Sequence, residues 1–380
     1  MKTQTFSYTA GAWSVAPDGA LDSDRTLVVL FGASGLIDHP APLERVMGAY
    51  PRSTIVGCSS SGEIHGTRIY DDSLAVAVAK FERTTLRLAT AQIGGTGDSF
   101  AAGETLSRQL NAADLRAVLI LSDGLQVNGS ELVRGFNAVL PPPVTVTGGL
   151  AGDGDRFART WVIADRRPAP GHVSAVGLYG DAVRVGHGSK GGWDVFGVER
   201  LVTRSCGNVL YELDGKPALQ LYKDYLGERA SGLPAAGLLF PLTLRKGRDD
   251  EKRLVRTILA VDEAAQSMTF AGDIPEGDYA QLMCANFDRL IQGAGEAAVS
   301  ARGGAAAGSE PLAIAISCIG RRLVLGERTE EETEASLEVL PPGTRQIGFY
   351  SYGEISPYAS GHCDLHNQTM TLTTIAEAQA

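Results

Sequence analysis

The sequence predicts an α/β fold of mixed sheets with flanking helices, built from imperfect internal βαβ repeats and arranged in two domains. A short apolar run occurs three times, and each time a helical stretch, a proline-marked turn and a second β-type run follow it. Strand, helix and strand in this order are typical of a βαβ crossover. Elsewhere apolar residues alternate with period two, as they do in antiparallel strands with one solvated face.

The apolar runs open each repeat. They are residues 27–31, 118–121 and 314–316. Continuous apolar runs of this length are typical of central strands that are buried on both faces. The helical stretches that follow are residues 43–50, 130–139 and 330–339. Prolines at positions 51, 141–143 and 341–342 then end these helices, because proline cannot continue a helix.

Each second β-type run ends in a turn of small residues. Residues 57–64 read Gly-Cys-Ser-Ser-Ser-Gly-Glu-Ile, and residues 348–355 read Gly-Phe-Tyr-Ser-Tyr-Gly-Glu-Ile. A weaker copy occupies residues 144–153. This recurrence indicates a duplicated unit that brings equivalent turns together. We expect a binding crevice where they meet, since ligands of open α/β sheets bind outside the carboxyl ends of the strands.

The other segments complete the expected sheets and helices. Period-two strands are expected at residues 73–79, 174–179 and 369–375. Helices are expected from 99 through Leu110, from Pro217 through Tyr225, and from Tyr279 to about Ser300. The pair Asp214-Gly215 marks a domain boundary. The expected division is an N-terminal arm at 1–24 and domains at 25–213 and 214–380.

The composition is that of a globular chain of 380 residues, with 44% apolar residues, 21% charged residues and a formal net charge of −10. The acidic balance argues against nucleic acid or an anionic membrane surface as a partner. No apolar stretch reaches the roughly 20 residues of a membrane helix, and the first residues lack the apolar core of a signal peptide. We therefore expect a cytoplasmic location.

The strong enzyme motifs are absent from the sequence. Gly215-Lys216 is followed by Pro217, so there is no phosphate-binding P-loop, and the turn at 58–62 lacks the leading glycine of a nucleophile elbow. The five cysteines form no Cys-x-x-Cys pair, which argues against a zinc knuckle. We expect a binding protein and not an enzyme. An unrecognised enzyme that uses Cys58 as its nucleophile is the catalytic alternative.

The two clearest turn copies supply the candidate ligand pocket. Small residues at a strand end expose N–H groups and hydroxyls, and a carboxylate there can anchor a cationic group. The candidate residues are Cys58, Ser59, Ser61, Gly62, Glu63, Ser351, Gly353, Glu354 and His366. The alternative is a purely structural turn whose glutamate caps a neighbouring backbone.

His187 is the candidate for a bulky planar ligand. Glycines flank it in the stretch 185–193, which leaves room beside the imidazole, and Trp193 could wall such a pocket. The structural alternative is a glycine hairpin with an exposed histidine. His366, His362 and His65 are its rivals.

The motifs at 57–64, 147–153, 213–218 and 349–355 together resemble the FIST family, over about residues 25 to 365. That family comprises an N-terminal and a C-terminal FIST domain found in intracellular signalling proteins. The resemblance implies a sensory ligand-binding module.

The stretch 186–194 also resembles the stand-alone bacterial FIST proteins called NosP. This narrower resemblance implies a haem that senses nitric oxide, with His187 as the candidate axial ligand to the haem iron. It also implies a partner in trans, either a histidine kinase or an enzyme of cyclic di-GMP turnover, and a homodimer is a further expectation. A haem-based nitric oxide sensor is therefore the leading hypothesis. A sensor of a small polar metabolite such as an amino acid, without haem, is the alternative.

Overall fold

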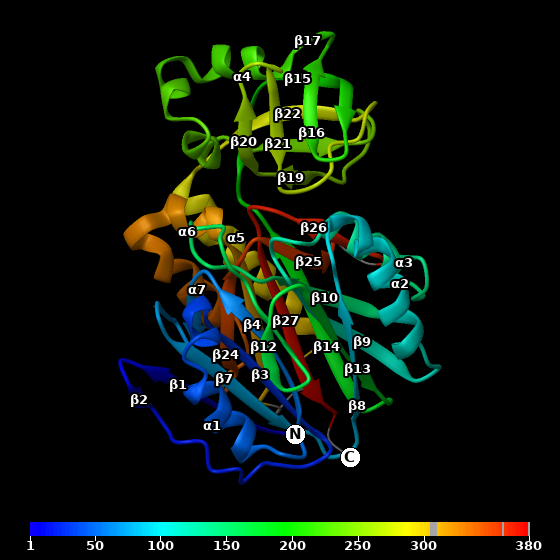
Figure 1. The fold of residues 1–380 in the computed structure, drawn as a ribbon, viewed down its shortest axis with the longest axis vertical. Coiled ribbons are helices and arrows are strands. Elements are labelled where there is room, and N and C mark those ends of the chain that lie inside the picture. Colours follow the sequence, from blue (N-terminus) through cyan, green and yellow to red (C-terminus); the bar gives the residue numbers. More distant parts are fainter. Residues whose placement is uncertain (305–309, 359–360, 379–380) are drawn as a thin grey trace.

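The computed structural model describes residues 1–304, 310–358 and 361–378. Three sheets form one body, and a fourth sheet forms a second lobe at one end of it (Figure 1). Both chain termini lie at the opposite end of the body. We call the lower part the body and the upper lobe, which the chain forms between Asp194 and Cys284, the inserted domain.

The body consists of three repeats of four strands each. The first has β1 (Lys2–Thr9), β3 (Thr26–Ala33), β4 (Thr54–Ser60) and β7 (Leu74–Lys80). The second has β8 (Thr85–Gln92), β9 (Leu115–Ser122), β10 (Thr145–Leu150) and β13 (His172–Tyr179). The third has β14 (Val183–Lys190), β23 (Leu312–Cys318), β24 (Arg345–Ser351) and β27 (Met370–Glu377). In each repeat the second and third strands pair in parallel, and the fourth pairs antiparallel with the second.

Each sheet is completed by a hairpin from another repeat. The hairpin β5 (Glu63–His65) and β6 (Arg68–Tyr70) leaves the first repeat and pairs with β24. The hairpin β25 (Gly353–Pro357) and β26 (Cys363–His366) leaves the third repeat and pairs with β10. The hairpin β11 (Val162–Ala164) and β12 (Arg167–Ala169) leaves the second repeat and pairs with β4. The three repeats therefore exchange hairpins in a closed cycle.

Helices cover the outer face of each sheet, and the inner faces share one core. The main helices are α1 (Ala41–Ala49), α2 (Ser99–Leu110), α3 (Gly129–Asn137), α5 (Phe287–Ala301), α6 (Ile319–Leu325) and α7 (Thr329–Glu338). The shared core includes Phe31 from the first repeat, Leu119 from the second and Ile316 from the third, all nearly inaccessible to solvent. Alternate strand residues face the helices, so both faces of each central strand are apolar, as a buried parallel pair requires.

Short elements join these units. The remaining strand of the first sheet is β2 (Ala12–Trp13). The short 3₁₀ turns are η1 (Ser34–Ile37), η2 (Thr96–Asp98), η3 (Gly227–Gly232), η4 (Ala235–Leu239), η5 (Arg302–Gly304) and η6 (Gly326–Arg328). None of the described helices is long and apolar enough to cross a membrane.

The inserted domain interrupts the third repeat between β14 and α5. Its strands are β15 (Asp194–Cys206), β16 (Val209–Leu213), β17 (Lys216–Pro217), β18 (Leu242–Arg245), β19 (Leu254–Arg256), β20 (Ile258–Asp262), β21 (Ser267–Phe270) and β22 (Tyr279–Cys284). Helix α4 (Ala218–Leu226) packs on this sheet, as its apolar spacing predicts. Asp194 pairs with Cys284, so the chain enters and leaves the domain side by side.

The repeats, their helices and the mixed sheets confirm the predicted fold class. The single helix expected from Tyr279 to Ser300 is wrong in its first part. Residues 279–284 form β22, because Ala280 and Leu282 alternate into the core of the inserted sheet between β15 and β18. The helix begins only after Asn286, whose side chain accepts the Arg289 N–H as an N-cap.

The domain limits predicted from the sequence lie within sheets of the structure. Position 214 lies in the turn between β16 and β17, within the inserted sheet. The expected N-terminal arm contains β1, which pairs along its length with β7. The inserted sheet, from Asp194 to Cys284, therefore spans the predicted boundary at position 214.

Candidate functional site

The two turns predicted to meet, and the turn of the weaker copy, are joined by equivalent backbone hydrogen bonds. Ser61 N–H donates to the carbonyl of Tyr350 at 2.9 Å, and Tyr352 N–H donates to Leu150 at 3.2 Å. Gly152 N–H donates to Ser59 at 3.0 Å and closes the ring. The turn of each repeat is thus bonded to the second parallel strand of another repeat, and the three turns converge on one approximate threefold axis.

The three turns, which these hydrogen bonds join into a closed ring, pack against one another with almost no free space between them. A Cβ at Gly152 would lie 2.2 Å from Ser61 Oγ, and one at Gly62, whose φ is +135°, would lie 2.4 Å from the Arg322 guanidinium. Only glycine avoids both the clash and the strained backbone conformation at Gly62. The small residues of the motif therefore permit close packing between repeats.

The carboxylates of the two clearest turn copies have partners inside the protein. Glu63 accepts hydrogen bonds from the N–H and hydroxyl of Ser73, at 3.1 and 2.7 Å. Glu354 accepts the equivalent bonds from Thr369, at 3.2 and 2.9 Å. Each glutamate thus binds the residue just before the last strand of its repeat. Burial raises the pKa of both carboxyl groups to about 8, although these hydrogen bonds act in the opposite direction.

The hydroxyl groups of the candidate pocket are also buried and bonded. Ser59 Oγ accepts the Trp161 N–H at 3.1 Å, Ser61 Oγ accepts the Gly154 N–H at 2.9 Å, and Ser351 donates to Glu354 at 2.6 Å. Gly353 begins β25 and lies against Leu150 and Leu365. A ligand that used these groups would have to replace bonds that already hold the repeats together.

Cys58 lies in the shared core with no exposed surface. Burial raises the pKa of its thiol well above the ordinary value. The thiolate is the nucleophilic form, and this environment disfavours it.

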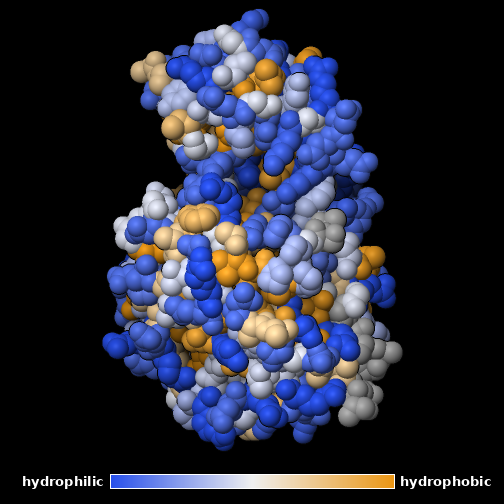
Figure 2. Space-filling view, turned by 90° about the vertical axis from the view of Figure 1, so that its right-hand side faces the viewer, coloured by the Kyte–Doolittle hydropathy of each residue, from blue (hydrophilic) through white to orange (hydrophobic). Residues whose placement is uncertain are grey.

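A cavity of about 510 Å³ lies where the converged turns face the inserted domain, and we call it the interdomain cleft. The body contributes Asp155, Phe157, Cys318, Ile319, Gly320, Leu323 and Tyr352. The inserted domain contributes Pro234, Ala235, Leu238, Thr257, Ile258, Leu259 and Ala271. The waist between the two lobes is indented, and hydrophobic residues are visible inside it (Figure 2).

The cleft lies outside the carboxyl ends of parallel strands. Cys318 is the last residue of β23, Tyr352 follows β24, and Phe157 belongs to the loop after β10. This is the edge at which α/β sheets bind their ligands. The expected crevice therefore exists on this side of the ring, although different side chains line it.

An aromatic pair forms one wall of the cleft. The rings of Phe157 and Tyr352 stack at 4.4 Å with an interplanar angle of 15°. The Tyr352 hydroxyl contacts the Asp153 carboxylate and donates to the Gly154 carbonyl at 3.0 Å, so it fixes the loop that carries Phe157. At the position of Tyr352 in the ring, the other two repeats carry Ser61 and Gly152. The repeats are therefore asymmetric at this wall of the cleft.

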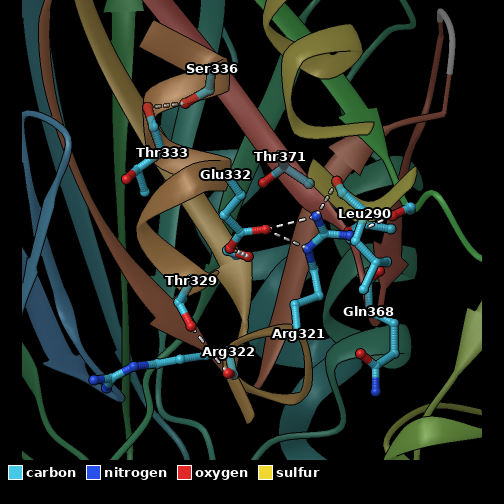
Figure 3. A network of polar contacts seen from close by, with 12 residues as sticks. Leu290, Arg321, Arg322, Thr329, Glu332, Thr333, Ser336, Gln368 and Thr371 are labelled. Atoms are coloured by element: carbon cyan, nitrogen blue, oxygen red, sulfur yellow. Dashed lines mark hydrogen bonds and ion pairs between the residues drawn. The ribbon is translucent and has the colours of Figure 1, made fainter. Parts of the chain in front are cut away.

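Helix α6 links the cleft to both connections of the inserted domain. Ile319 and Leu323 border the cleft, while Arg321 points into the body and is fully buried (Figure 3). Its guanidinium donates to the carbonyl of Leu290 at 2.8 Å and also to that of Gly191. Gly191 lies where the chain leaves the body, and Leu290 lies where it returns. One side chain thus contacts both connecting segments.

A carboxylate balances the charge of Arg321. Glu332 on α7 accepts two of its N–H groups, at 2.7 and 3.0 Å, and has no exposed surface (Figure 3). The second Glu332 oxygen accepts the hydroxyls of Ser317 and Tyr350, at 2.9 and 2.7 Å. This saturated network fixes α6 relative to β23, β24 and α7.

Comparison with known families agrees with this architecture. The model of the FIST N domain matches residues 26–216, and the model of the FIST C domain matches residues 218–357.

The chain belongs to the FIST family.

FIST domains are sensory ligand-binding domains, and both of them contribute to the inserted sheet of this FIST protein. Among curated proteins, none matches the sequence. Among solved structures, a cyanuric acid hydrolase from A. caulinodans is similar over 100% of this chain and 99% of its own, at 9% identity and a TM-score of 0.38. Similarity at this level carries no functional conclusion.

His187 of the FIST protein lies within β14, not in a loop, and pairs with Thr373 of β27. The ring is partly buried, which lowers its pKa, and its Nδ1 has no hydrogen-bond partner among the described residues. A histidine that ligates a metal usually donates its other N–H to a carbonyl or carboxylate. His187 also borders neither the interdomain cleft nor the cavity beside Trp193. The surroundings of His187 in this structure therefore do not fit a haem.

Trp193 and His366, by contrast, border one cavity of about 250 Å³, together with Arg253 and Tyr358. The Trp193 indole donates to the Gln368 carbonyl at 2.8 Å, and His366 Nε2 lies 2.9 Å from the Ser356 carbonyl. Burial lowers the pKa of His366 to about 4, so its imidazole is neutral at pH 7. No group of three or more His, Cys, Asp or Glu residues in the described ranges could hold a metal ion.

None of the residues that line the cleft is among the site residues predicted from the sequence. One sequence signal could have found the aromatic pair, since Tyr352 lies where the other copies of the turn have small residues. Phe157 lies four residues after the weaker copy at 144–153, and its unusual exposure of 47% is visible only in the structure. The inserted residues carry no such signal, because only the fold brings Leu238 and Thr257 to the turns.

Proposed function

We propose that this FIST protein is a sensor that binds a small molecule in the interdomain cleft and does not catalyse a reaction. Ligand pockets are typically concave, mostly apolar and placed between domains, with a few polar groups that fix orientation. The observation that supports the proposal is the cavity of about 510 Å³ between the converged turns and the inserted domain. Its volume lies in the usual range of roughly 300–1,000 Å³ for ligand sites.

The position of the cleft also suggests how binding would be signalled. A ligand that contacts both Leu323 on α6 and Ile258 on the inserted domain stabilises the orientation of the inserted domain in which these two residues border one cavity. Arg321 ties the same helix to both connecting segments. Occupancy of the cleft would therefore change the orientation of the inserted domain. A separate protein would respond to this change, and we retain a histidine kinase or a cyclic di-GMP enzyme as the partner class.

The test is a thermal-shift screen of small metabolites against the wild-type protein and a variant with a filled cleft. Leu323→Trp places a larger side chain in the cleft, and Leu323 is 46% exposed, so the variant should fold. Val299→Trp is the matched control, because Val299 is 52% exposed on α5 and does not border the cleft. A ligand at 100 times its Kd stabilises the folded state by about 2.7 kcal/mol.

We expect at least one compound to raise the Tm of the wild type and of Val299→Trp, but not that of Leu323→Trp. A compound that stabilises all three proteins equally binds elsewhere. If every stabilising compound behaves in that way, the proposed site is wrong.

The haem hypothesis requires a different test. The residues around His187 do not fit a haem in this conformation, so haem binding there needs the inner face of β14 to open. Haem-supplemented protein with a Soret band that shifts on addition of nitric oxide, and that is lost in His187→Ala, would establish this opening. A spectrum without a Soret band would reject haem binding.

A further inference from the structure

We propose that the ligand of the interdomain cleft is an organic cation, with an apolar or aromatic body in the cleft and an ammonium group beside Asp155. This inference rests on the proposed function, because it names the class of ligand for the same site. It follows from the distribution of charge along the cleft and from the nature of its walls.

Asp155 stands where the apolar cleft meets a second, polar cavity. That cavity measures about 520 Å³ and shares Asp155, Ile319 and Leu323 with the cleft. A ligand whose body occupies the cleft can therefore place its polar end at Asp155 and extend toward the polar cavity.

The positive charges of the polar cavity are already neutralised. Arg322 forms a two-bond ion pair with Asp71, at 2.8 and 2.7 Å, and also donates to the Ser61 carbonyl. Arg156 lies 3.9 Å from the Asp153 carboxylate and donates to the Ser34 hydroxyl at 3.1 Å. Each of these arginines therefore already has a carboxylate partner in the protein.

The negative charges at the same place include two without a counter-charge. Asp155 and Glu327 both border the polar cavity, and neither forms an ion pair within the described parts of the chain. The site therefore attracts cations and repels carboxylates and phosphates. The attraction weakens as salt is added, because Asp155 is exposed to solvent.

The side chains that line the cleft also favour an organic cation as the ligand. The stacked rings of Phe157 and Tyr352 border the cavity, and the face of an aromatic ring attracts an organic cation. Thr257 also borders the cleft, is 4% exposed, and its Oγ1 has no partner among the described residues. A buried hydroxyl without a partner favours a ligand that carries a hydrogen-bonding group.

The experiment compares three probes of nearly equal shape by calorimetric titration at pH 7. Tryptamine is the cation, tryptophol its neutral counterpart, and indole-3-propionate the anion. We expect tryptamine to bind up to about fivefold more tightly than tryptophol, as one exposed ion pair provides. Indole-3-propionate should bind more weakly than either. The preference for tryptamine should decrease as NaCl is raised from 50 to 500 mM.

Two variants locate the effect. Asp155→Asn should reduce the ratio of the tryptamine and tryptophol affinities to near one. Asp114→Asn should keep the full preference, because Asp114 is exposed and precedes β9, at the end of that strand away from the cleft. Both substitutions affect exposed side chains, so both variants should fold.

Each result decides the inference. Equal or tighter binding of tryptophol or indole-3-propionate overturns it and leaves the proposed function standing. A preference for tryptamine that survives Asp155→Asn also overturns it, because the cation is then recognised elsewhere. If none of the three probes binds, the proposal of an organic cation is wrong. The thermal-shift screen with Leu323→Trp decides separately whether the cleft binds any small molecule.

Discussion

The Arg321 guanidinium binds the Glu332 carboxylate at 2.7 Å, and neither side chain has any exposed surface. A buried ion pair of this kind contributes little net stability compared with an apolar pair, but the loss of one partner is costly. Because Arg321 also contacts the carbonyls of Gly191 and Leu290, the pair sets the position of both connections to the inserted domain.

Arg321→Met should destabilise the protein by about 3–5 kcal/mol, since it leaves the Glu332 charge buried without its partner. The free energy of unfolding from urea titration measures this. Arg52→Met is the matched control, because Arg52 and its partner Asp24 are 61% and 77% exposed, and it should cost far less than Arg321→Met. Equal losses in the two variants would show that burial of the ion pair does not matter.

Gly62→Ala should destabilise the protein by about 1–3 kcal/mol, because φ at Gly62 is +135° and the new methyl group would meet the Arg322 guanidinium. Gly35→Ala is the control, since no atom lies within 4 Å of the added Cβ there. Denaturant titrations of both variants give the comparison. A Gly62→Ala protein as stable as Gly35→Ala would contradict the close packing of the turns.

Tyr352→Phe should cost about 1–3 kcal/mol, because Asp153 and Gly154 lose a buried hydroxyl partner and the Phe157 loop loosens. Tyr50→Phe is the control, since the buried Tyr50 hydroxyl has no partner among the described residues, and its removal should be neutral or stabilising. The two variants differ from the wild type by one oxygen atom each. A more stable Tyr352→Phe protein would show that its hydroxyl is not needed to fix the loop.

The stability of the protein should fall as the pH rises from about 6.5 to 8. Above 6.5, the ordinary pKa of histidine, the buried histidines with lowered pKa are neutral in both the folded and the unfolded state and do not oppose this trend. Burial raises the pKa of Glu63 and Glu354 from the ordinary value of 4.5 to about 8, so the folded state holds protons that the unfolded state has lost. Linkage then makes the free energy of unfolding decrease over this window and level off above it.

The double variant Glu63→Gln/Glu354→Gln should show a weaker dependence on pH between 6.5 and 8 than the wild type. Glu334→Gln on the exposed side of α7 should follow the wild type. Unfolding titrations at several pH values measure the slope. An unchanged slope in the double variant would assign the dependence to other groups.

The repeats could be predicted because their signals are local. The apolar run at 27–31 and the turn at 57–64 each describe a single strand and its end, and the same signals return in the other repeats. The meeting of the turns follows from the parallel pairing of the strands that carry them. Sequence patterns therefore predicted both the fold class and the convergence of the turns.

The roles of the glutamates could not be decided from the sequence, because they depend on partners that the turn itself does not contain. Glu63 binds Ser73 and Glu354 binds Thr369, each across the length of a hairpin. The structural alternative, a carboxylate that caps a neighbouring backbone, describes these bonds. The walls of the cleft could not be predicted either, since Leu238 and Tyr352 border the same cavity only when a long insertion folds back over the body.

The exchange of hairpins has a consequence for the history of this architecture. The strands β5, β11 and β25 each pair with the sheet of a different repeat. The gain or loss of a single repeat would therefore expose two sheet edges without a partner strand. The inserted domain is free of that constraint, since its two ends are neighbours at Asp194 and Cys284. Evolution could thus replace the inserted domain, and with it half of the residues that line the interdomain cleft, while the body with its exchanged hairpins stayed unaltered.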